Sequence, residues 1–469
     1  MKKILVLGLD GLDYHYCSFL MQKGVLPHLC DLKKKGVFKS LKSTEPANSF
    51  PAWTSFMTGA DPGEHGIFYP LIYQQKNSYK HELVSSLSPK EKNIWQKLSA
   101  NGISVGIINQ PMTFPVFEVN GFMISGRLTP HMDSEFCFPP EMKSELVREF
   151  PEYRINVSWN DFLSDGENLI RFLKNIDSRK ELSFYLFDKY DPDVKTVIHT
   201  ETDSVCHKLW NDKKLIDHLY IKMDELVKDY TDRYRDHNII IISDHGFGSC
   251  YATVNINKFL EEKGLLEFKR TKEEKKTFKG IKSRAKKILY AVKVLENLRE
   301  FRKKNNKRRR SYKGIEEDIN FSKTKVFCRD DLGLRVNLEG REPRGIVKER
   351  EVPDLYKKLR EDILSMEDGL HFNYRIFNDL LKKEEVYTGR FVKYAPDYIF
   401  QYRPFYDRCV KANYTKGDIV QSNDQMSGKH TPFGVYFSSE DYEKNISHME
   451  ISSIKDIAGL IEALCGSKP

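Results

Sequence analysis

The chain has 469 residues, of which 40% are hydrophobic and 30% are charged. This composition excludes an intrinsically disordered chain and allows a large buried core. No apolar run approaches the roughly 18 to 20 residues that a membrane-spanning helix needs. The eight cysteines are scattered, and none forms a CxxC pair. We therefore expect reduced thiols and a cytoplasmic location rather than a disulfide framework.

The net charge of +9 is unevenly distributed along the chain. Residues 270–313 contain 19 Lys or Arg and four Glu, a local charge of +15, which leaves −6 on the remainder. Apolar residues from Ile281 to Leu295 recur at helical spacing, so the segment is predicted to form a basic amphipathic helix. Such a helix either covers the core with a solvated outer face or binds an anionic membrane surface. No nucleic-acid-binding pattern accompanies the charge, which disfavours that class of partner.

Elsewhere, short apolar runs alternate with helical patterns. This alternation predicts an α/β fold: a three-layer sandwich with helices on both faces of a mostly parallel sheet. The predicted strands are 3–9, 103–109, 122–125, 195–199, 239–242 and 397–401. The predicted helices are 51–58, 141–150, 166–190, 203–211, 216–230, 353–365 and 454–464. Residues 1–267 and 319–469 are thus expected to form the catalytic core, interrupted by a basic helical insertion at 268–318.

Acidic residues follow the first of these strands and the strand at 195–199. Ligands of such sheets bind beyond the carboxyl ends of the strands, so these residues are candidates for a site. The first strand ends at Asp10, and the later strand is followed by Asp203 and His207. The four-residue spacing of Asp203 and His207 places both on one face of a helix, which suits two ligands of one metal ion.

Histidines mark two further positions of the same kind. The strand at 239–242 runs into Asp244 and His245, and Gly246 would permit a turn that directs both side chains inward. His430 lies in a polar loop before an apolar run. Each pattern alone is more typical of a helix cap or a plain turn. Their joint occurrence in one α/β chain indicates a metal site.

Several segments, in order, resemble those of the alkaline phosphatase superfamily and, within it, the type I phosphodiesterase/nucleotide pyrophosphatase family. ILVLGLDGLD at 4–13 is similar to the first strand with its metal-binding aspartate. PANSFPAWTSFMTG at 46–59 resembles the nucleophile segment, and DPGEHGI at 61–67 resembles the motif that follows it. The resemblance covers nearly the whole chain outside the predicted insertion.

The resemblance implies two divalent metal sites. Asp203, His207 and His430 would hold one ion, and Asp10, Ser49, Asp244 and His245 would hold the other. Mixed imidazole and carboxylate ligands favour zinc, with manganese as the alternative. Ser49 would be the nucleophile, activated by metal coordination, and would form a covalent phosphoseryl intermediate before water completes hydrolysis.

This sequence departs from the family's pattern after the HGI motif. Pro70 stands where relatives carry an asparagine that contacts the phosphate, so the amide donor is missing. No other cation or donor is evident for a third phosphate oxygen, and we therefore expect diesters to be cleaved faster than monoesters. His65 is assigned to structure rather than to the metals. The segment at Cys17 lacks the C-x-P-x-R motif of sulfatases, which disfavours that activity.

The expected function is a two-metal phosphoester hydrolase of the phosphodiesterase/nucleotide pyrophosphatase type, acting on a small-molecule phosphate ester. The alternative is a phosphotransferase, a mutase or a head-group transferase, which would use the same bimetal site and differ in the acceptor. A non-catalytic docking protein is a third possibility, against which the complete ligand set argues. The expected location is the cytoplasm, at the membrane periphery if 270–313 binds anionic lipid.

Overall fold

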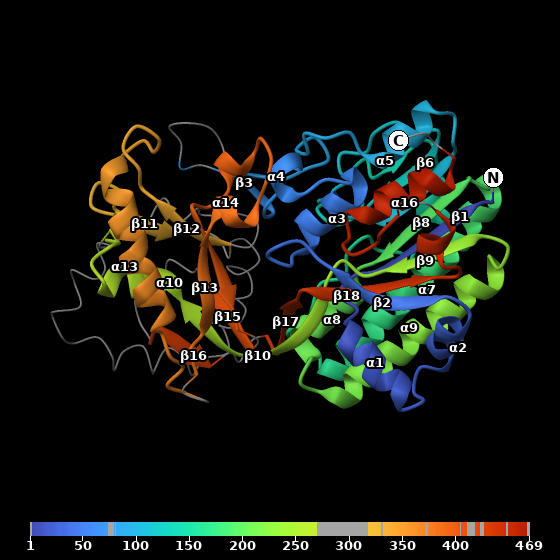
Figure 1. Cartoon of the computed structure of the whole chain (residues 1–469). Helices are drawn as coiled ribbons and strands as arrows, with labels where there is room; N and C mark the ends of the chain where they lie inside the picture. Colours follow the sequence, from blue (N-terminus) through green and yellow to red (C-terminus); the bar gives the residue numbers. More distant parts are fainter. Residues whose placement is uncertain are drawn as a thin grey trace, which may run out of the picture.

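The computed structural model describes residues 2–73, 79, 81–269, 318–329, 332–370, 374–403, 405–409, 418–422, 426–446 and 449–466. The chain folds into two lobes (Figure 1). The larger lobe is built on an eight-stranded sheet, the smaller on a four-stranded sheet, and a further sheet around one long strand lies between them. Over the described residues, no helix is both long and apolar enough to span a membrane.

The large sheet is mostly parallel, as predicted. In spatial order its strands are β2 (Val37–Lys42), β18 (Phe433–Ser438), β9 (Asn238–Ile242), β1 (Ile4–Leu9), β8 (Val194–His199), β5 (Val105–Gln110), β6 (Gly121–Ser125) and β7 (Cys137–Phe138). The five from β9 to β6 are mutually parallel, whereas β18 and β7 run antiparallel to their neighbours. Because β9, β1 and β8 are adjacent, the residues that follow them meet at one edge of the sheet.

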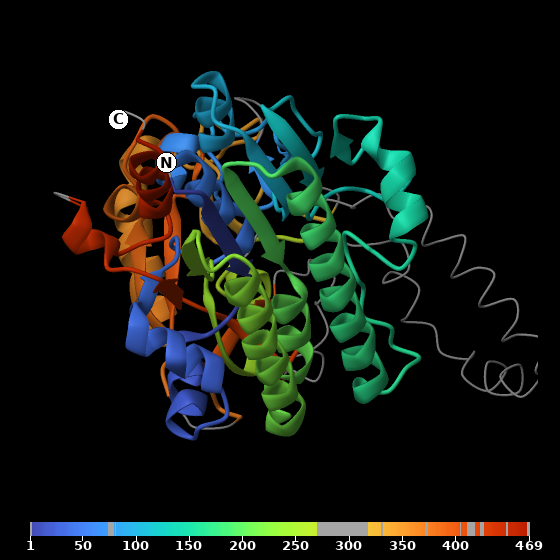
Figure 2. The ribbon, with the colours of Figure 1, turned by 90° about the vertical axis from the view of Figure 1, so that its right-hand side faces the viewer.

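Helices cover both faces of this sheet and complete the three-layer sandwich (Figures 1 and 2). One face is covered by α1 (Tyr14–Gln22), α2 (Pro27–Lys35), α6 (Met142–Glu149), α7 (Asp165–Tyr190), α8 (Glu201–Leu209) and α9 (Lys213–Arg233). The other is covered by α3 (Ser49–Thr58), α5 (Ile94–Ala100), α15 (Tyr442–Asn445) and α16 (Asp456–Leu464). Side chains of β1 alternate between the two faces: Leu5 and Leu7 join one hydrophobic cluster, Ile4 and Val6 the other. Burial on both faces explains why this strand is a continuous apolar run.

The smaller lobe has a separate hydrophobic cluster. Its antiparallel sheet has the order β11 (Val326–Cys328), β12 (Gly333–Val336), β14 (Tyr398–Tyr402) and β13 (Phe377–Lys382). Helices α10 (Ile256–Glu262) and α13 (Val352–Leu364) pack into the same cluster. Its remaining helical turns are η4 (Glu349–Glu351), α14 (Lys383–Val386) and η5 (Val392–Tyr394). A helical turn, α4 (Pro62–His65), and a hairpin of β3 (Leu71–Tyr73) and β4 (His81–Leu83) follow α3 in the chain.

The long strand β10 (Gly246–Asn255) connects the two lobes and was not predicted from the sequence. It pairs with β15 (Phe405–Cys409), β16 (Val420–Ser422) and β17 (Gly428–Thr431). Gly246 begins this strand and does not adopt a left-handed turn as expected. A Cβ at Gly246 would lie 2.3 Å from Asp13 Oδ2 and from the Phe433 carbonyl oxygen, so the glycine is required for close packing.

The helix expected at 51–58 begins two residues earlier than predicted. Asn48 is its N-cap and accepts a hydrogen bond from the Phe50 amide, which makes Ser49 the first helical residue instead of Pro51. The remaining predicted strands and helices of the large lobe occur within a few residues of their expected ends. Most of the predicted insertion, 270–317, lies outside the described residues. Its two ends are adjacent, because Phe268 and Ile319 form a β-bridge and Lys269 N donates to the Asp318 carbonyl at 2.7 Å.

Candidate active site

Three aspartates meet at the carboxyl ends of the adjacent strands β9, β1 and β8. Asp10 directly follows β1, Asp203 lies in the first turn of α8 after β8, and Asp244 follows β9 by two residues. All three side chains are buried. Hydrogen bonds hold these loops in place: Asp10 N donates to the His199 carbonyl at 2.9 Å, and Gly11 N donates to Asp244 Oδ1 at 3.2 Å. The strand order, rather than sequence proximity, thus gathers three carboxylates.

Three histidines complete the cluster with a shared orientation. Each places its Nδ1 beside a backbone carbonyl: Gly428 for His207 at 3.1 Å, Ala47 for His430 at 3.2 Å and Gly246 for His245 at 3.1 Å. Because a carbonyl oxygen can only accept a hydrogen bond, the proton of each neutral ring is placed on Nδ1. Nε2 therefore carries the lone pair, which is the arrangement of metal-ligating histidines whose other nitrogen donates to the protein.

Asp203, His207 and His430 form the outer group of the cluster. His430 Nε2 lies 3.0 Å from Asp203 Oδ1 and 2.9 Å from His207 Nε2, and His207 Nε2 lies 3.3 Å from the same Asp203 oxygen. The predicted placement of Asp203 and His207 on one face of a helix is confirmed by this contact. The side chains of His207 and His430 remain partly exposed, at 23% and 17%.

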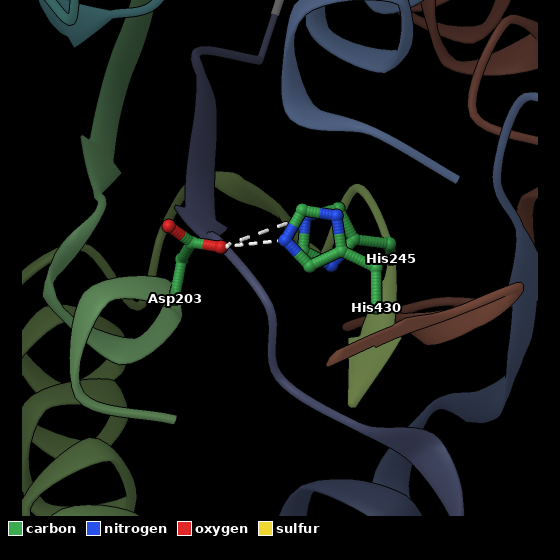
Figure 3. Close-up of side chains that lie close together, drawn as sticks. All are labelled: Asp203, His245 and His430. Atoms are coloured by element: carbon green, nitrogen blue, oxygen red, sulfur yellow. Dashed lines mark hydrogen bonds and ion pairs between the residues drawn. The ribbon is translucent and has the colours of Figure 1, made fainter. Parts of the chain in front are cut away.

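Asp10, Asp244 and His245 form the inner group, and all three are fully buried. One ligand atom of each lies within 4.8 Å of the others. His245 Nε2 is 3.3 Å from Asp244 Oδ2 and 3.6 Å from Asp10 Oδ1. The His245 ring also stacks on that of His430, with 3.7 Å between the ring centroids, and its Nε2 is 3.9 Å from Asp203 Oδ1 (Figure 3). His245 therefore adjoins both groups.

Ser49 lies beside the inner group at the N-terminus of α3. Its Oγ is 3.2 Å from His245 Nε2 and 3.4 Å from Asp10 Oδ1. One turn along α3, Trp53 Nε1 donates to Asp10 Oδ2 at 3.0 Å. Gly8 makes room for this helix, since a Cβ there would lie 2.7 Å from the Trp53 ring. The positive end of the helix is thus directed at the serine hydroxyl, where it favours a bound anion.

The electrostatics of the two groups differ. Burial, followed by the Asp244 and Asp203 charges, holds the pKa of Asp10 well above its ordinary value. Burial and the Asp203 charge raise the pKa of Asp244 to about 8. Burial acts in the same direction on Asp203, but in the metal-free protein the charges of protonated His207 and of Arg127 outweigh it and hold the pKa of Asp203 well below its ordinary value. Burial lowers the pKa of His245 to about 4, so this imidazole is neutral and able to bind a cation.

The donor set fits two divalent cations. Asp244 Oδ2 is buried and has no hydrogen-bond partner among the residues that the structure describes. Besides burial, the charges of Asp244 and Asp203 raise the pKa of Asp10, and the Nε2 lone pairs of His207 and His430 face one another at 2.9 Å. A cation between these atoms would neutralise the carboxylate charges and accept the imidazole lone pairs. Zinc commonly binds imidazole and carboxylate ligands together.

The sequence interpretation missed one charged residue of the site. Arg127 follows β6 and donates from Nη1 to Asp203 Oδ2 at 2.7 Å. Its position after a strand at the carboxyl edge of the sheet was an available signal, although a lone arginine there carries no recognisable pattern. His65 has the structural role that was expected of it, whereas the expected effect of Pro70 on phosphate binding stays a prediction. His65 is buried, with Nε2 3.0 Å from Ser55 Oγ and Nδ1 accepting from Ile67 N at 3.1 Å. Pro70 has no N–H to offer a phosphate.

A three-layer sandwich with carboxylates, imidazoles and a helix-terminal serine at its strand ends defines an alkaline-phosphatase-like protein. Solved structures share this fold. Phosphonoacetate hydrolase from Sinorhizobium meliloti 1021, in complex with phosphonoformate, matches with a TM-score of 0.60 and 12% identity over 99% of this chain and 95% of that chain. Murine ectonucleotide pyrophosphatase / phosphodiesterase 5 matches with a TM-score of 0.51 and 14% identity over 100% and 96%.

The family is established by sequence. The profile of the type I phosphodiesterase / nucleotide pyrophosphatase family matches residues 4–431, nearly the whole chain. The chain therefore belongs to this family of the alkaline phosphatase superfamily, and it is a phosphoester hydrolase. No curated protein sequence matches it significantly. An inactive variant of the murine phosphodiesterase 5, in complex with AMP, has a TM-score of 0.50 and 13% identity over 100% of this chain and 96% of that chain.

Proposed function

We propose that the protein hydrolyses phosphate esters with two divalent ions and Ser49 as nucleophile. The observation that supports this proposal is that three carboxylates and three imidazole Nε2 atoms form one cluster, and that the Ser49 hydroxyl at the N-terminus of α3 contacts two of its members, Asp10 and His245. The outer and inner groups would each hold one ion, preferably zinc, with manganese as the alternative. Bound ions would supply charge neutralisation and a lowered pKa for the serine hydroxyl.

The residues of the chain define the remaining steps. The helix end at Ser49 attracts the phosphate and holds its phosphorus opposite the hydroxyl oxygen. Ser49 Oγ forms a bond to phosphorus while the bond to the leaving-group oxygen breaks, which gives a phosphoseryl ester. Water then attacks this ester and releases phosphate from Ser49.

A substrate panel with the full-length protein tests this function. The panel contains an aryl phosphomonoester, an aryl phosphodiester and a nucleotide anhydride, each with zinc or manganese. We expect turnover of at least one member, loss of turnover on chelation and recovery when the ion is returned. Absence of turnover on every member, in protein that is folded and contains both ions, would contradict the proposal.

Transfer to an acceptor other than water is the alternative, because the same phosphoseryl ester could be attacked by an alcohol. It is distinguished by adding glycerol or another alcohol during turnover of either aryl ester. A hydrolase releases aryl alcohol and the product of water attack in equal amounts, which is inorganic phosphate from the monoester and an alkyl phosphate from the diester. For the diester, that alkyl phosphate takes the place of inorganic phosphate in this comparison. Release of aryl alcohol in large excess over phosphate, with phosphorylated acceptor, would assign the protein to the transferases.

We also propose a cytoplasmic location in which residues 270–313 contact an anionic membrane surface. The support is the local charge of +15 on a remainder of −6. Each basic residue near an anionic leaflet contributes on the order of 1 kcal/mol, and salt screens the attraction. Intact protein should co-sediment with anionic but not neutral vesicles at low salt, whereas protein lacking 270–313 should not. Equal binding to both vesicle types would contradict this role.

A further inference from the structure

Arg127 is held at the edge of the site by a constrained turn. Thr129 donates from its amide and from its hydroxyl to the Gly126 carbonyl, at 3.1 and 2.6 Å. Gly126 packs so closely that a Cβ there would lie 2.3 Å from the Gln110 carbonyl oxygen. Leu128 adopts the left-handed region with a φ of +81°. Such a backbone conformation is costly for leucine and is characteristic of functional sites, where the surrounding structure enforces it.

The Arg127 side chain reaches the site between the nucleophile helix and the outer group. Nη1 donates to Asp203 Oδ2, the carboxylate oxygen that is not directed at His430. The guanidinium carbon lies 5.9 Å from the centre of the Phe50 ring, and Phe50 directly follows Ser49. Arg127 therefore adjoins both a predicted metal ligand and the residue after the nucleophile.

Part of the Arg127 side chain remains accessible. The Arg127 side chain is 35% exposed, whereas Asp203 is 1% exposed. A guanidinium has five N–H donors arranged for planar anions such as carboxylates and phosphates. Arg127 also lines a cavity of about 180 Å³ together with Asn156, Ser158 and Ser204. Glu201 and Ser204 also line it, so the cavity adjoins α8, the helix that carries Asp203.

One carboxylate, that of Glu201, also lines the cavity, but it is already neutralised. Arg179 Nη1 donates to one Glu201 oxygen and Asn175 Nδ2 to the other, each at 2.6 Å. All three side chains are buried. Of the two charged side chains that line the cavity, Arg127 is therefore the one whose charge would attract an entering anion.

A charge count shows what Arg127 adds. Asp10, Asp203 and Asp244 contribute −3 and an ionised Ser49 contributes −1, which two divalent ions balance. Arg127 then leaves the site with a charge of +1 before substrate enters. We propose that Arg127 binds a third anionic oxygen of the reacting phosphoryl group and thereby favours dianionic phosphomonoesters over monoanionic diesters. This inference rests on the proposed function and replaces the diester preference, which assumed that no such cation existed.

The test compares Arg127→Gln and Arg127→Lys with wild-type protein, all reconstituted with zinc. Three substrates are used: p-nitrophenyl phosphate, methyl p-nitrophenyl phosphate, and a methyl aryl diester with a carboxylate on the aryl leaving group. We expect Arg127→Gln to lower kcat/KM about 10- to 100-fold on the monoester, the range for one charge-assisted hydrogen bond. The loss on the monoester should exceed the loss on either diester by about 10-fold or more, and Arg127→Lys should recover part of it.

Two further readouts separate substrate binding from positioning of Asp203. Calorimetry of inorganic phosphate binding to the zinc protein should show a dissociation constant raised about 10- to 100-fold in Arg127→Gln. Elemental analysis should show unchanged zinc content. An equal loss on all three substrates with reduced zinc would overturn the inference, since Arg127 would then act only through Asp203. A loss confined to the carboxylate-bearing diester would overturn it in favour of a leaving-group contact.

The inference and the proposed function fail in different ways. If wild-type protein cleaves none of the three substrates, the hydrolytic function is wrong, while phosphate binding still tests Arg127. If wild-type protein is active and phosphate binding is the same in wild-type and Arg127→Gln protein, the role of Arg127 is wrong and the hydrolytic function stands.

Discussion

The inner and outer groups of the site both consist of aspartate and histidine side chains, but the pKa values of their aspartates are shifted in opposite directions. In the outer group, Asp203 has Arg127, His207 and His430 within hydrogen-bonding distance, and its pKa is held below the ordinary value. In the inner group, Asp10 and Asp244 face each other without a protein cation among the described contacts, and both pKa values are raised. Burial is complete in the inner group and partial in the outer group.

The difference teaches which half of the site depends on bound metal. A buried charge without a partner is costly, so the inner carboxylates gain most from a divalent ion. The outer carboxylate is already stabilised by the protein, which leaves its metal-binding geometry in place before the ion arrives. We therefore expect the inner group to govern the stability of the metal-free protein and the outer group to be preorganised.

The largest expected effect is that of Ser49→Ala, which tests whether the inner group holds the nucleophile. Removing Oγ, which contacts Asp10 and His245, should lower kcat by about four orders of magnitude or more, as for loss of other catalytic nucleophiles. Metal content and the thermal unfolding midpoint should stay near those of wild type, because neither depends chiefly on this hydroxyl. Near-normal turnover in the purified variant would show that another group attacks phosphorus.

The next effect concerns the support of the outer group. Arg179 and Glu201 form a buried pair beneath the first turn of α8, the helix that carries Asp203 and His207. Arg179→Leu leaves the Glu201 charge buried without its cation and should lower the free energy of unfolding by about 3–5 kcal/mol. Chemical denaturation measures this change.

Two control variants test whether the loss of stability in Arg179→Leu comes from the unpaired buried charge of Glu201. The double variant Arg179→Leu/Glu201→Leu removes both charges and should be more stable than Arg179→Leu alone. Arg148→Ala breaks an exposed pair with Glu149 and should leave stability close to that of wild type. If Arg179→Leu is no more destabilising than Arg148→Ala, the buried pair does not support α8.

A smaller effect is the pH dependence of the metal-free protein. The folded-state pKa of Asp244 is raised to about 8 by burial and Asp203, so the folded protein holds a proton that the unfolded chain has lost. Stability from this group is therefore lost as the pH rises through 8. Between pH 7 and pH 9 the loss is about 1 kcal/mol for one such group. The lowered pKa values of His245 and His430 act only below about pH 6.5, where their unfolded forms become protonated.

Thermal unfolding of chelator-treated protein measures this trend. The midpoint should fall from pH 7 to pH 9 in metal-free wild type, and Asp244→Asn should reduce the dependence because the amide does not ionise, while Asp10 keeps a pKa raised by burial. Zinc-loaded wild type is the matched control, in which the bound ion keeps the carboxylate ionised at both pH values. A metal-free midpoint that rises over this interval would contradict the description of the inner group.

Much of the fold and of the ligand set could be predicted from the sequence. Buried parallel strands such as β1 and β9 are uninterrupted apolar runs, and the residues after them, Asp10 and Asp244, are visible in one dimension. The approach of His430 to His207 was given only by family resemblance. It depends on the pairing of β17 with β10, which is a long-range contact without a local signal.

Two features escaped the sequence for physical reasons. In the strand β10, glycine, serine, tyrosine and threonine separate the apolar residues, so it lacks the continuous apolar run of a core strand although it links the lobes. Arg127 became visible only when the order β8, β5, β6 brought the end of β6 near Asp203. Spatial strand order is not encoded in local composition, and a residue that acts through it cannot be recognised beforehand.

The most direct test of the account is the number of metal ions bound per chain. Elemental analysis of full-length protein reconstituted with zinc and freed of excess ion should give two ions per chain. His430→Ala, which removes an outer ligand and leaves Asp10, Asp244 and His245 intact, should retain one. A wild-type protein that binds no ion after reconstitution, or only one, would contradict the two-metal site on which the proposed hydrolysis depends.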